Sequence, residues 1–205
     1  KKFIKTNEKN IIDIGAGNGF LLNQFVNDGW NCTGIEPSKS MTEEAFERYN
    51  IEIENKNLED FFLNNTSTKY NLVTMSHVLE HIYFPKDIIK KIKELITENG
   101  FLYIEVPSVE GFADEKINNE IMSFTHLWHY TTKTLENFIS SQGFRVIASE
   151  NSIENDFPVI RILFQIQNTM KENIITKNDI FQTKEWFLKI CDIRDRRRKD
   201  GIKKI

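Results

Sequence analysis

The chain has few cysteines, no long apolar run and no excess of positive charge. Its two cysteines, Cys32 and Cys191, lie far apart, so the sequence predicts no disulfide framework and favours a reducing, cytoplasmic location. No stretch approaches the roughly 18 apolar residues of a membrane span, and no secretory pattern opens the chain. The net charge of −3 argues against a nucleic-acid partner. A globular protein that acts on small molecules remains.

Residues 9–38 have the pattern of a strand, a glycine turn, a helix and a second strand. The isoleucine-rich run at residues 11–14 fits a buried parallel strand, and Gly15, Gly17 and Gly19 follow where the chain turns into a helix. Glycine permits positive φ there and leaves no Cβ between the backbone and a ligand. The second strand ends at Glu36, whose carboxylate can accept both hydroxyls of a ribose. The pattern predicts half of a nucleotide-binding unit.

The glycine spacing distinguishes between nucleosides. Dinucleotide-binding turns have GxGxxG, whereas this chain has GxGxG and a bulky Phe20 at the third glycine position, which disfavours NAD. Together with Asp13 and the sequence Glu36-Pro37-Ser38, the turn resembles motif I and the acidic second-strand tip of class I S-adenosylmethionine-dependent methyltransferases. The VLEH segment at residues 78–81 resembles the same superfamily, and the order of elements matches it to about residue 168.

The resemblance implies S-adenosylmethionine as cofactor, S-adenosylhomocysteine as product, and a site at the ends of strands one, two and four. Asn57 stands where many relatives have aspartate. The residues that match the family's cofactor-binding positions are Asp13, Gly15, Ala16, Gly17, Glu36, Pro37, Asn57, Leu58, Ser76 and His77.

The expected fold is α/β, a Rossmann-like, doubly wound, mostly parallel seven-stranded sheet with an antiparallel last strand and a C-terminal helical extension. We expect the methyltransferase domain at residues 1–168, with an N-terminal covering helix missing, and the extension at 169–205. Helices are predicted at 40–49, with an apolar side that includes Met41 and Phe46, and from Pro85 to Asn99-Gly100. The predicted strands are 11–14, 32–36, 51–53, 70–76, 101–106, 144–150 and 159–167.

The four histidines fall into two short strings, at 77 and 81 and at 126 and 129. Methylation of a hydroxyl needs a base, and the pKa of histidine suits that role. We predict His81 and His126 as bases and His129 as a residue that orients one of them or the substrate; a structural role for each single histidine stays open. Residues 109–125 are expected to form a lid, and the acceptor enters beneath residues 107–130. The aromatic side chains of Tyr83, Phe84, Trp128 and Tyr130 are expected to line the acceptor pocket.

The string HVLEH also matches the HxxEH pattern of one class of zinc peptidases. It follows a parallel strand instead of lying within a long helix, so this interpretation is disfavoured and no metal site is predicted. Some relatives with an acidic-His segment at this place use a divalent ion, and the resemblance leaves open that His77, Glu80 and His81 hold one.

The whole-chain likeness favours O-methylation of a carbohydrate, a nucleotide-linked sugar or another small phosphorylated metabolite. The alternatives are methylation at nitrogen or carbon, or an inactive cofactor-binding subunit that pairs with an active methyltransferase. No nucleic acid or membrane partner is expected. A C-terminal helix carrying Phe181, Trp186, Phe187 and Ile190 is expected to pack on the domain, in a homodimer or on a partner subunit, and the RDRRRKD run is either a solvated end or a site for a phosphate-bearing acceptor.

Overall fold

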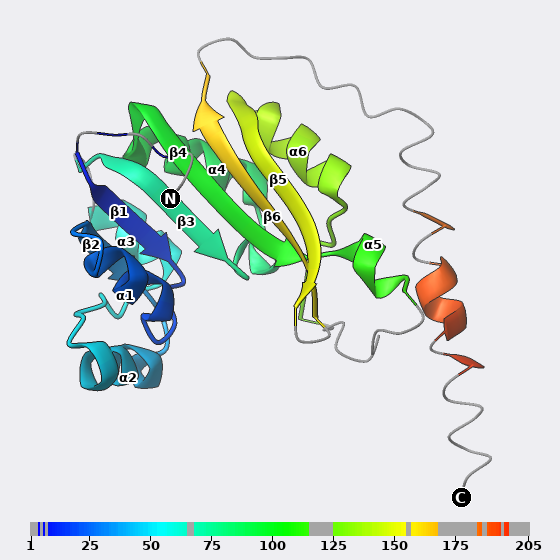
Figure 1. Ribbon diagram of the computed structural model, residues 1–205, viewed down its shortest axis with the longest axis horizontal. Helices are drawn as coiled ribbons and strands as arrows, with labels where there is room; N and C mark the ends of the chain where they lie inside the picture. The colour runs from blue at the N-terminus through cyan, green and yellow to red at the C-terminus, as the bar shows by residue number, and fades with distance from the viewer. Residues whose placement is uncertain are drawn as a thin grey trace, which may run out of the picture.

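The computed structural model describes residues 4, 6, 8–64, 68–114, 125–154, 157–167, 184–185, 188–193 and 195–196. Over these residues, six strands form one mixed sheet in the order β2-β1-β3-β4-β6-β5 (Figure 1). Neighbours from β2 to β4 are parallel, whereas β6 runs antiparallel to both β4 and β5. The strands are β1 (Asn10–Ile14), β2 (Asn31–Ile35), β3 (Tyr70–Ser76), β4 (Ile96–Pro107), β5 (Phe144–Glu154) and β6 (Phe157–Ile166).

The mostly parallel sheet with an antiparallel last strand is confirmed, but the strand expected at residues 51–53 does not form. Ile51 and Ile53 are buried, and a single bridge between Glu54 and Ile35 takes the place of a seventh strand at the β2 edge. The Asn55 side-chain amide donates to the carbonyl oxygens of Glu36 and Pro37. The Asn55 side chain therefore occupies the backbone carbonyl groups that a longer strand pairing with β2 would need as acceptors.

Helices cover the two faces of the sheet unequally. Along β1, Ile12 and Ile14 pack with α3, α4 and α6 on one face, and Ile11 packs with α1 and α2 on the other, as the period of two in a strand requires. Within the described residues, no helix covers β4, β5 and β6 on the second face (Figure 1). The helices are α1 (Phe20–Val26), α2 (Lys39–Tyr49), α3 (Leu58–Asn64), α4 (Pro85–Leu95), α5 (Val109–Phe112) and α6 (Thr132–Ser140), with a 3₁₀ turn η1 (Leu79–His81).

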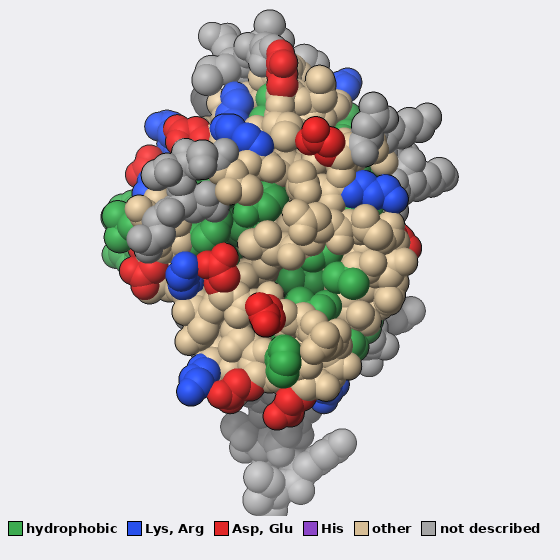
Figure 2. Space-filling view, turned by 90° about the vertical axis from the view of Figure 1, so that its left-hand side faces the viewer, with side chains coloured by type: hydrophobic (Ala, Val, Ile, Leu, Met, Phe, Trp, Pro, Cys, Tyr) green, Lys and Arg blue, Asp and Glu red, His purple; other side chains and the backbone are tan. Residues whose placement is uncertain are grey.

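Two sequence expectations about helices need correction. Helix α4 begins at Pro85 as predicted but ends at Leu95, because Ile96 is extended and pairs with Tyr70 as the first residue of β4. On α2, Met41 and Phe46 are 42% and 52% exposed, because the helix buries only Ala45. The side of the molecule that carries β2 and α2 shows apolar side chains at the surface among interspersed acidic and basic ones (Figure 2).

The C-terminal part is described in pieces. Residues 188–193 are helical, and Ile190 packs against Val109, Phe112 and Ala113. Phe181, Trp186 and Phe187 lie outside the described residues, as do residues 115–124 of the expected lid. The boundary at residue 168 stays a prediction. Among the residues described, none of the helices is both long enough and apolar enough to span a membrane.

Candidate active site

The turn after β1 is built around Gly15. Its φ is +72°, and a Cβ placed there would lie 2.4 Å from Cγ2 of Val78, so both the backbone and the packing require glycine. The amides of Gly15 and Ala16 donate to the Ile35 carbonyl at 2.9 and 3.0 Å. This pairing fixes the end of β1 beside the end of β2, where a ligand of an open α/β sheet binds.

Glu36 stands at the tip of β2 with its carboxylate held by two backbone amides. Oε2 accepts a hydrogen bond from the Gly17 amide at 3.0 Å, and Oε1 accepts one from the Ser38 amide at 2.9 Å. Each oxygen keeps a lone pair for a further donor. Apart from Gly17 and its two neighbours in the chain, no heavy atom of the described residues lies within 4 Å of a Cβ built on Gly17, so these residues leave space for a ligand above this turn.

A cleft of about 400 Å³, which we call the cofactor cleft, opens beside this turn at the ends of β1, β2 and β3. Among the predicted cofactor residues, Gly15, Pro37, Asn57 and Leu58 line it; Ala16, Gly17 and Glu36 are outside its lining, although Glu36 and Gly17 adjoin it through their hydrogen bond. Sequence reasoning missed Lys56, Val78 and Ile82. The other lining residues are Ile14, Ile35, Glu59, His81, Tyr83, Phe84 and Ile88.

Two larger hollows lie elsewhere. One of about 610 Å³ lies on the uncovered sheet face, against Leu72, Tyr103 and Arg161, and one of about 830 Å³ lies between β2 and α2. Neither is lined by a histidine or by a residue predicted to bind the cofactor. Size therefore does not identify the functional site here, whereas the chemistry of the lining does.

Asp13 faces away from the cleft. It is buried on the second face of the sheet and accepts a hydrogen bond from the Thr74 hydroxyl at 2.6 Å. Burial raises the pKa of Asp13 to about 7, although the Thr74 hydrogen bond opposes the shift, and the nearby charge of Glu36 adds to it. A direct cofactor contact of Asp13 stays a prediction, and its observed partner is Thr74.

Ser76 and His77 turn toward Glu105 on the neighbouring strand β4. The Ser76 hydroxyl donates to Glu105 Oε1 at 2.8 Å, and Nε2 of His77 lies 3.2 Å from the same atom. The Tyr103 hydroxyl and the Arg161 guanidinium donate to Oε2. Burial alone would raise the pKa of Glu105, but the hydrogen bonds from His77, Arg161 and Ser76 outweigh it and hold the pKa at about 2.

His77 lies between two carboxylates at the end of β3, with a φ of 55° that is uncommon for a residue with a Cβ. Its Nδ1 is 3.4 Å from Glu80 Oε1, an ion-pair contact rather than an aligned hydrogen bond. Glu105 first, and Glu80 second, raise the pKa of His77 to about 9. His77 is therefore an imidazolium at neutral pH and has no free lone pair to act as a base.

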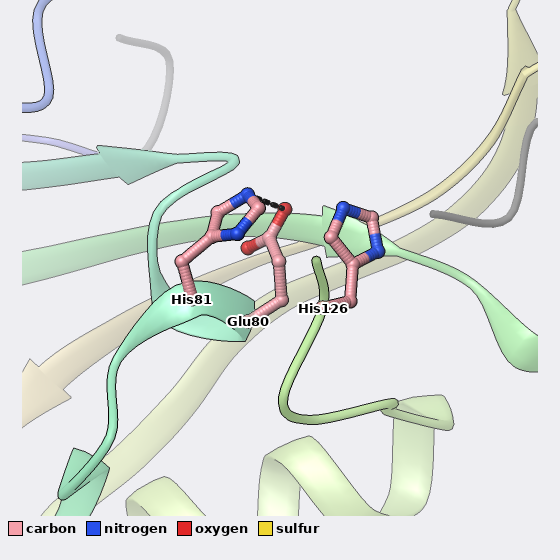
Figure 3. Close-up of side chains that lie close together, drawn as sticks. All are labelled: Glu80, His81 and His126. Carbon is pink, nitrogen blue, oxygen red and sulfur yellow. Dashed lines mark ion pairs between the residues drawn. The ribbon is translucent and has the colours of Figure 1, made fainter. Parts of the chain in front are cut away.

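The structure brings the two histidine strings together. His81 and His126 lie beside each other (Figure 3), with their ring centroids 4.8 Å apart. The ring centroids of His126 and His129 are 6.1 Å apart. Burial lowers the pKa of both His126 and His129, which leaves them neutral. Neutral imidazoles can accept a proton, so the arrangement is compatible with the predicted base roles. We call His81, His126 and His129 with Glu80 the histidine cluster.

Glu80 is the centre of this cluster, and the sequence raised it only as an alternative metal ligand with His77 and His81. Its side chain is 1% exposed, and neither carboxylate oxygen has a hydrogen-bond partner among the residues described. Sequence reasoning missed Glu105 and Arg161. A charged residue inside the apolar run FLYIEV is a signal for Glu105, because an acid in a buried strand needs partners.

The chain is similar to known proteins in sequence and in fold. The family described as methyltransferase domain matches residues 2–149. The chain belongs to this family. A ubiquinone biosynthesis O-methyltransferase of Actinobacillus pleuropneumoniae serotype 7 is 32% identical over 103 residues, which cover 46% of this chain and 44% of that protein. The chain thus spans less than half the length of the curated relatives that it matches.

Solved structures show the same fold. An S-adenosylmethionine-dependent methyltransferase of Listeria monocytogenes superposes with a TM-score of 0.64 at 19% identity, covering 82% of this chain and 96% of that one. A Burkholderia thailandensis 1,6-didemethyltoxoflavin-N1-methyltransferase with bound S-adenosylhomocysteine gives 0.62 at 12% identity, with 78% and 72% covered. The predicted class I methyltransferase fold is confirmed.

Proposed function

We propose that the chain is an S-adenosylmethionine-dependent methyltransferase that methylates a hydroxyl of a small molecule. The position of His81 carries the proposal: it lines the cofactor cleft, and its ring also contacts His126 in the histidine cluster. A cofactor in the cleft and an acceptor at the cluster would therefore meet at one residue. Residues 1–168 form the catalytic domain in this proposal, with 169–205 as a helical extension.

Each region has a separate task. The Glu36 carboxylate accepts the ribose hydroxyls, Asn57 and Leu58 border the adenine, and the Gly15–Gly17 turn lets the methionine part approach the backbone. The acceptor oxygen attacks the methyl carbon, the O–C bond forms as the C–S bond breaks, and the sulfur keeps the electron pair as S-adenosylhomocysteine. The hydroxyl proton passes to a ring nitrogen of His81 or His126, and His129 orients this pair. Alignment of the reacting atoms within about 3 to 3.5 Å supplies much of the rate.

The acceptor in this proposal has a hydroxyl on a flat ring. Tyr83 and Phe84 are 71% and 66% exposed with their rings in contact, and Trp128 is 44% exposed with its indole N–H bonded to the Ile82 carbonyl. Such aromatic walls suit a planar acceptor. The relatives at about 30% identity are named for ubiquinone biosynthesis, and none of those reported above is named for carbohydrate methylation, so the predicted sugar acceptor has no support from them.

A transfer assay with S-adenosylmethionine labelled in the methyl group tests the proposal. The acceptor panel holds phenols and catechols, free sugars, nucleotide sugars and the matching amines. Methylation of a ring hydroxyl is expected, with loss of rate in His81→Ala and no change in the exposed Glu98→Gln control. Cofactor binding without turnover of any acceptor, or transfer to the amines alone, would contradict O-methylation and favour an inactive subunit or an N-methyltransferase.

A further inference from the structure

We infer that Glu80, His81 and His126 form a binding site for a divalent transition metal, with Zn²⁺ the best fit. One ligand atom from each side chain lies within 4.8 Å of the others, and Figure 3 shows them around one space between η1 and the segment that precedes α6. The set differs from the alternative raised by the sequence, because His126 replaces His77. His77 is held on its other side by Glu105.

The buried carboxylate is the first observation that points to a cation. Glu80 is 1% exposed, and its two oxygens have no hydrogen-bond partner in the part of the chain that the structure describes. The Tyr130 hydroxyl, whose pKa is raised first by burial and then by the charge of Glu80, is buried without a partner over the same residues. The imidazolium of His77, which Glu80 shares with Glu105, faces one Glu80 oxygen at 3.4 Å without an aligned hydrogen bond. A bound cation would supply the direct ligation that both buried oxygens lack.

The orientation of His81 is the second observation. Its Nδ1 is 3.3 Å from the Thr125 carbonyl oxygen, which can only accept, so this nitrogen carries the proton. The lone pair is then on Nε2, which lies 3.9 Å from Glu80 Oε1. A metal-binding histidine commonly donates its other ring N–H to a carbonyl or carboxylate in this way, since that bond fixes the tautomer and the ring.

Backbone hydrogen bonds hold the third ligand in place. The amides of Leu127 and Trp128 donate to the Glu80 carbonyl at 2.9 and 3.1 Å, and the Trp128 indole donates to the Ile82 carbonyl at 2.8 Å. The segment that carries His126 is therefore fixed against η1. The cluster depends on this long-range docking and not on the VLEH sequence alone.

The donor set favours zinc over magnesium. Two imidazoles and one carboxylate, with a fourth position left open, are typical of catalytic Zn²⁺, whereas Mg²⁺ prefers six oxygen ligands. Ligand atoms around tetrahedral zinc lie about 3.4 Å apart, so rotation of the exposed His81 and half-buried His126 must close the present gaps by at most about 1.4 Å. If the proposed O-methylation holds, a hydroxyl at the fourth position would lose its proton more readily, and the metal would replace His81 and His126 as the group that promotes deprotonation, because a ligating imidazole has no free lone pair.

Zinc binding to the chelator-treated protein, without cofactor or acceptor, tests this site separately from methyl transfer. Titration with Zn²⁺ against a chromophoric chelator gives affinity and stoichiometry, and Co²⁺ in its place gives an absorption spectrum that reports tetrahedral nitrogen and oxygen ligation. The exposed Cys191 is replaced by serine throughout, because a thiol can bind zinc by itself. The variants are Glu80→Gln, which keeps the shape of the side chain, and His126→Ala; His129→Ala is the matched control.

One Zn²⁺ per chain is expected, with affinity lowered at least about 10-fold to 100-fold in Glu80→Gln and in His126→Ala and by less than about 3-fold in His129→Ala. Mg²⁺ should not compete. The inference fails if the folded protein binds no stoichiometric zinc. It also fails if the Glu80→Gln and His126→Ala variants bind zinc with the same affinity as the protein in which these side chains are unchanged. A protein that binds no zinc yet methylates a hydroxyl would overturn this inference and leave the proposed function intact.

Discussion

The cofactor cleft and the histidine cluster share His81, yet they are stabilised in different ways. In the cleft, hydrogen bonds from backbone amides fix the geometry. The amides of Gly15 and Ala16 donate to the Ile35 carbonyl, and those of Gly17 and Ser38 donate to the Glu36 carboxylate. In the cluster, side chains from distant segments meet around the Glu80 carboxylate, whose oxygens accept no hydrogen bond from the described residues. Backbone pairing fixes the geometry of the cleft, whereas the cluster keeps carboxylate oxygens and imidazole lone pairs available for chemistry.

The difference predicts separable defects. Changes in the cleft should alter folding and cofactor affinity. Changes in the cluster, apart from the shared His81, should alter turnover and metal binding and leave cofactor affinity unchanged. A cluster variant that lost cofactor affinity, or a cleft variant that lost turnover with folding and cofactor affinity intact, would contradict this separation.

The largest effect is expected from His126→Ala. Loss of a positioned base or ligand should lower kcat about 100-fold to 10,000-fold. Affinity for S-adenosylhomocysteine should stay within about 3-fold, because His126 does not line the cofactor cleft. Steady-state kinetics and calorimetry on the same preparation measure both quantities, and a parallel loss of cofactor affinity would show that the two regions are not separable.

Next comes Gly15→Ala, which should lower the free energy of unfolding by about 2 to 5 kcal/mol. Positive φ accounts for about 1 to 2 kcal/mol of this and the clash with Val78 for the rest. Gly29→Ala is a matched control, since Gly29 has a φ of +73° but no described atom within 4 Å of its Cβ position. Urea unfolding should show the smaller loss in Gly29→Ala, and Val78→Ala should restore part of the larger one; equal losses would exclude the clash.

Asp13, buried near the end of β1, gives the stability of the folded state a pH dependence. Because the folded pKa, about 7, is above the ordinary value of 3.8, the folded state keeps the proton that the unfolded state loses. The contribution to stability is present below about pH 4 and is lost as pH rises through 7, by about 2 to 4 kcal/mol in total. Asp13→Asn should remove this loss. Unfolding curves between pH 4 and 8 that fall equally in both proteins would assign the dependence to another group.

The smallest effect is expected from Glu36→Gln, which keeps one acceptor oxygen. Affinity for S-adenosylhomocysteine should fall about 5-fold to 150-fold, equivalent to about 1 to 3 kcal/mol. Glu43→Gln on the exposed side of α2 is the control and should bind as the unchanged protein does. Calorimetric titration at one pH compares the three proteins, and an unchanged affinity in Glu36→Gln would remove the ribose contact from the account.

These contrasts also explain what the sequence could predict. The Gly15 turn and Glu36 follow from strand and turn patterns that lie within about thirty residues, so local physics places them. His81 and His126 are 45 residues apart, and the Glu105–Arg161 pair spans 56, so only the topology of the sheet brings each pair together. The end of α4 was misplaced for a related reason: pairing of Ile96 with Tyr70 overrides a helical pattern that continues past it.

The central claim is that S-adenosylmethionine binds in the cofactor cleft with its ribose on Glu36. A crystal structure of the protein soaked with S-adenosylhomocysteine tests it most directly. The account predicts both ribose hydroxyls within hydrogen-bond distance of the Glu36 carboxylate, the adenine beside Asn57 and Leu58, and the sulfur directed toward His81. Ligand density on the uncovered sheet face, or an empty cleft with Glu36 still bonded only to Gly17 and Ser38, would contradict it.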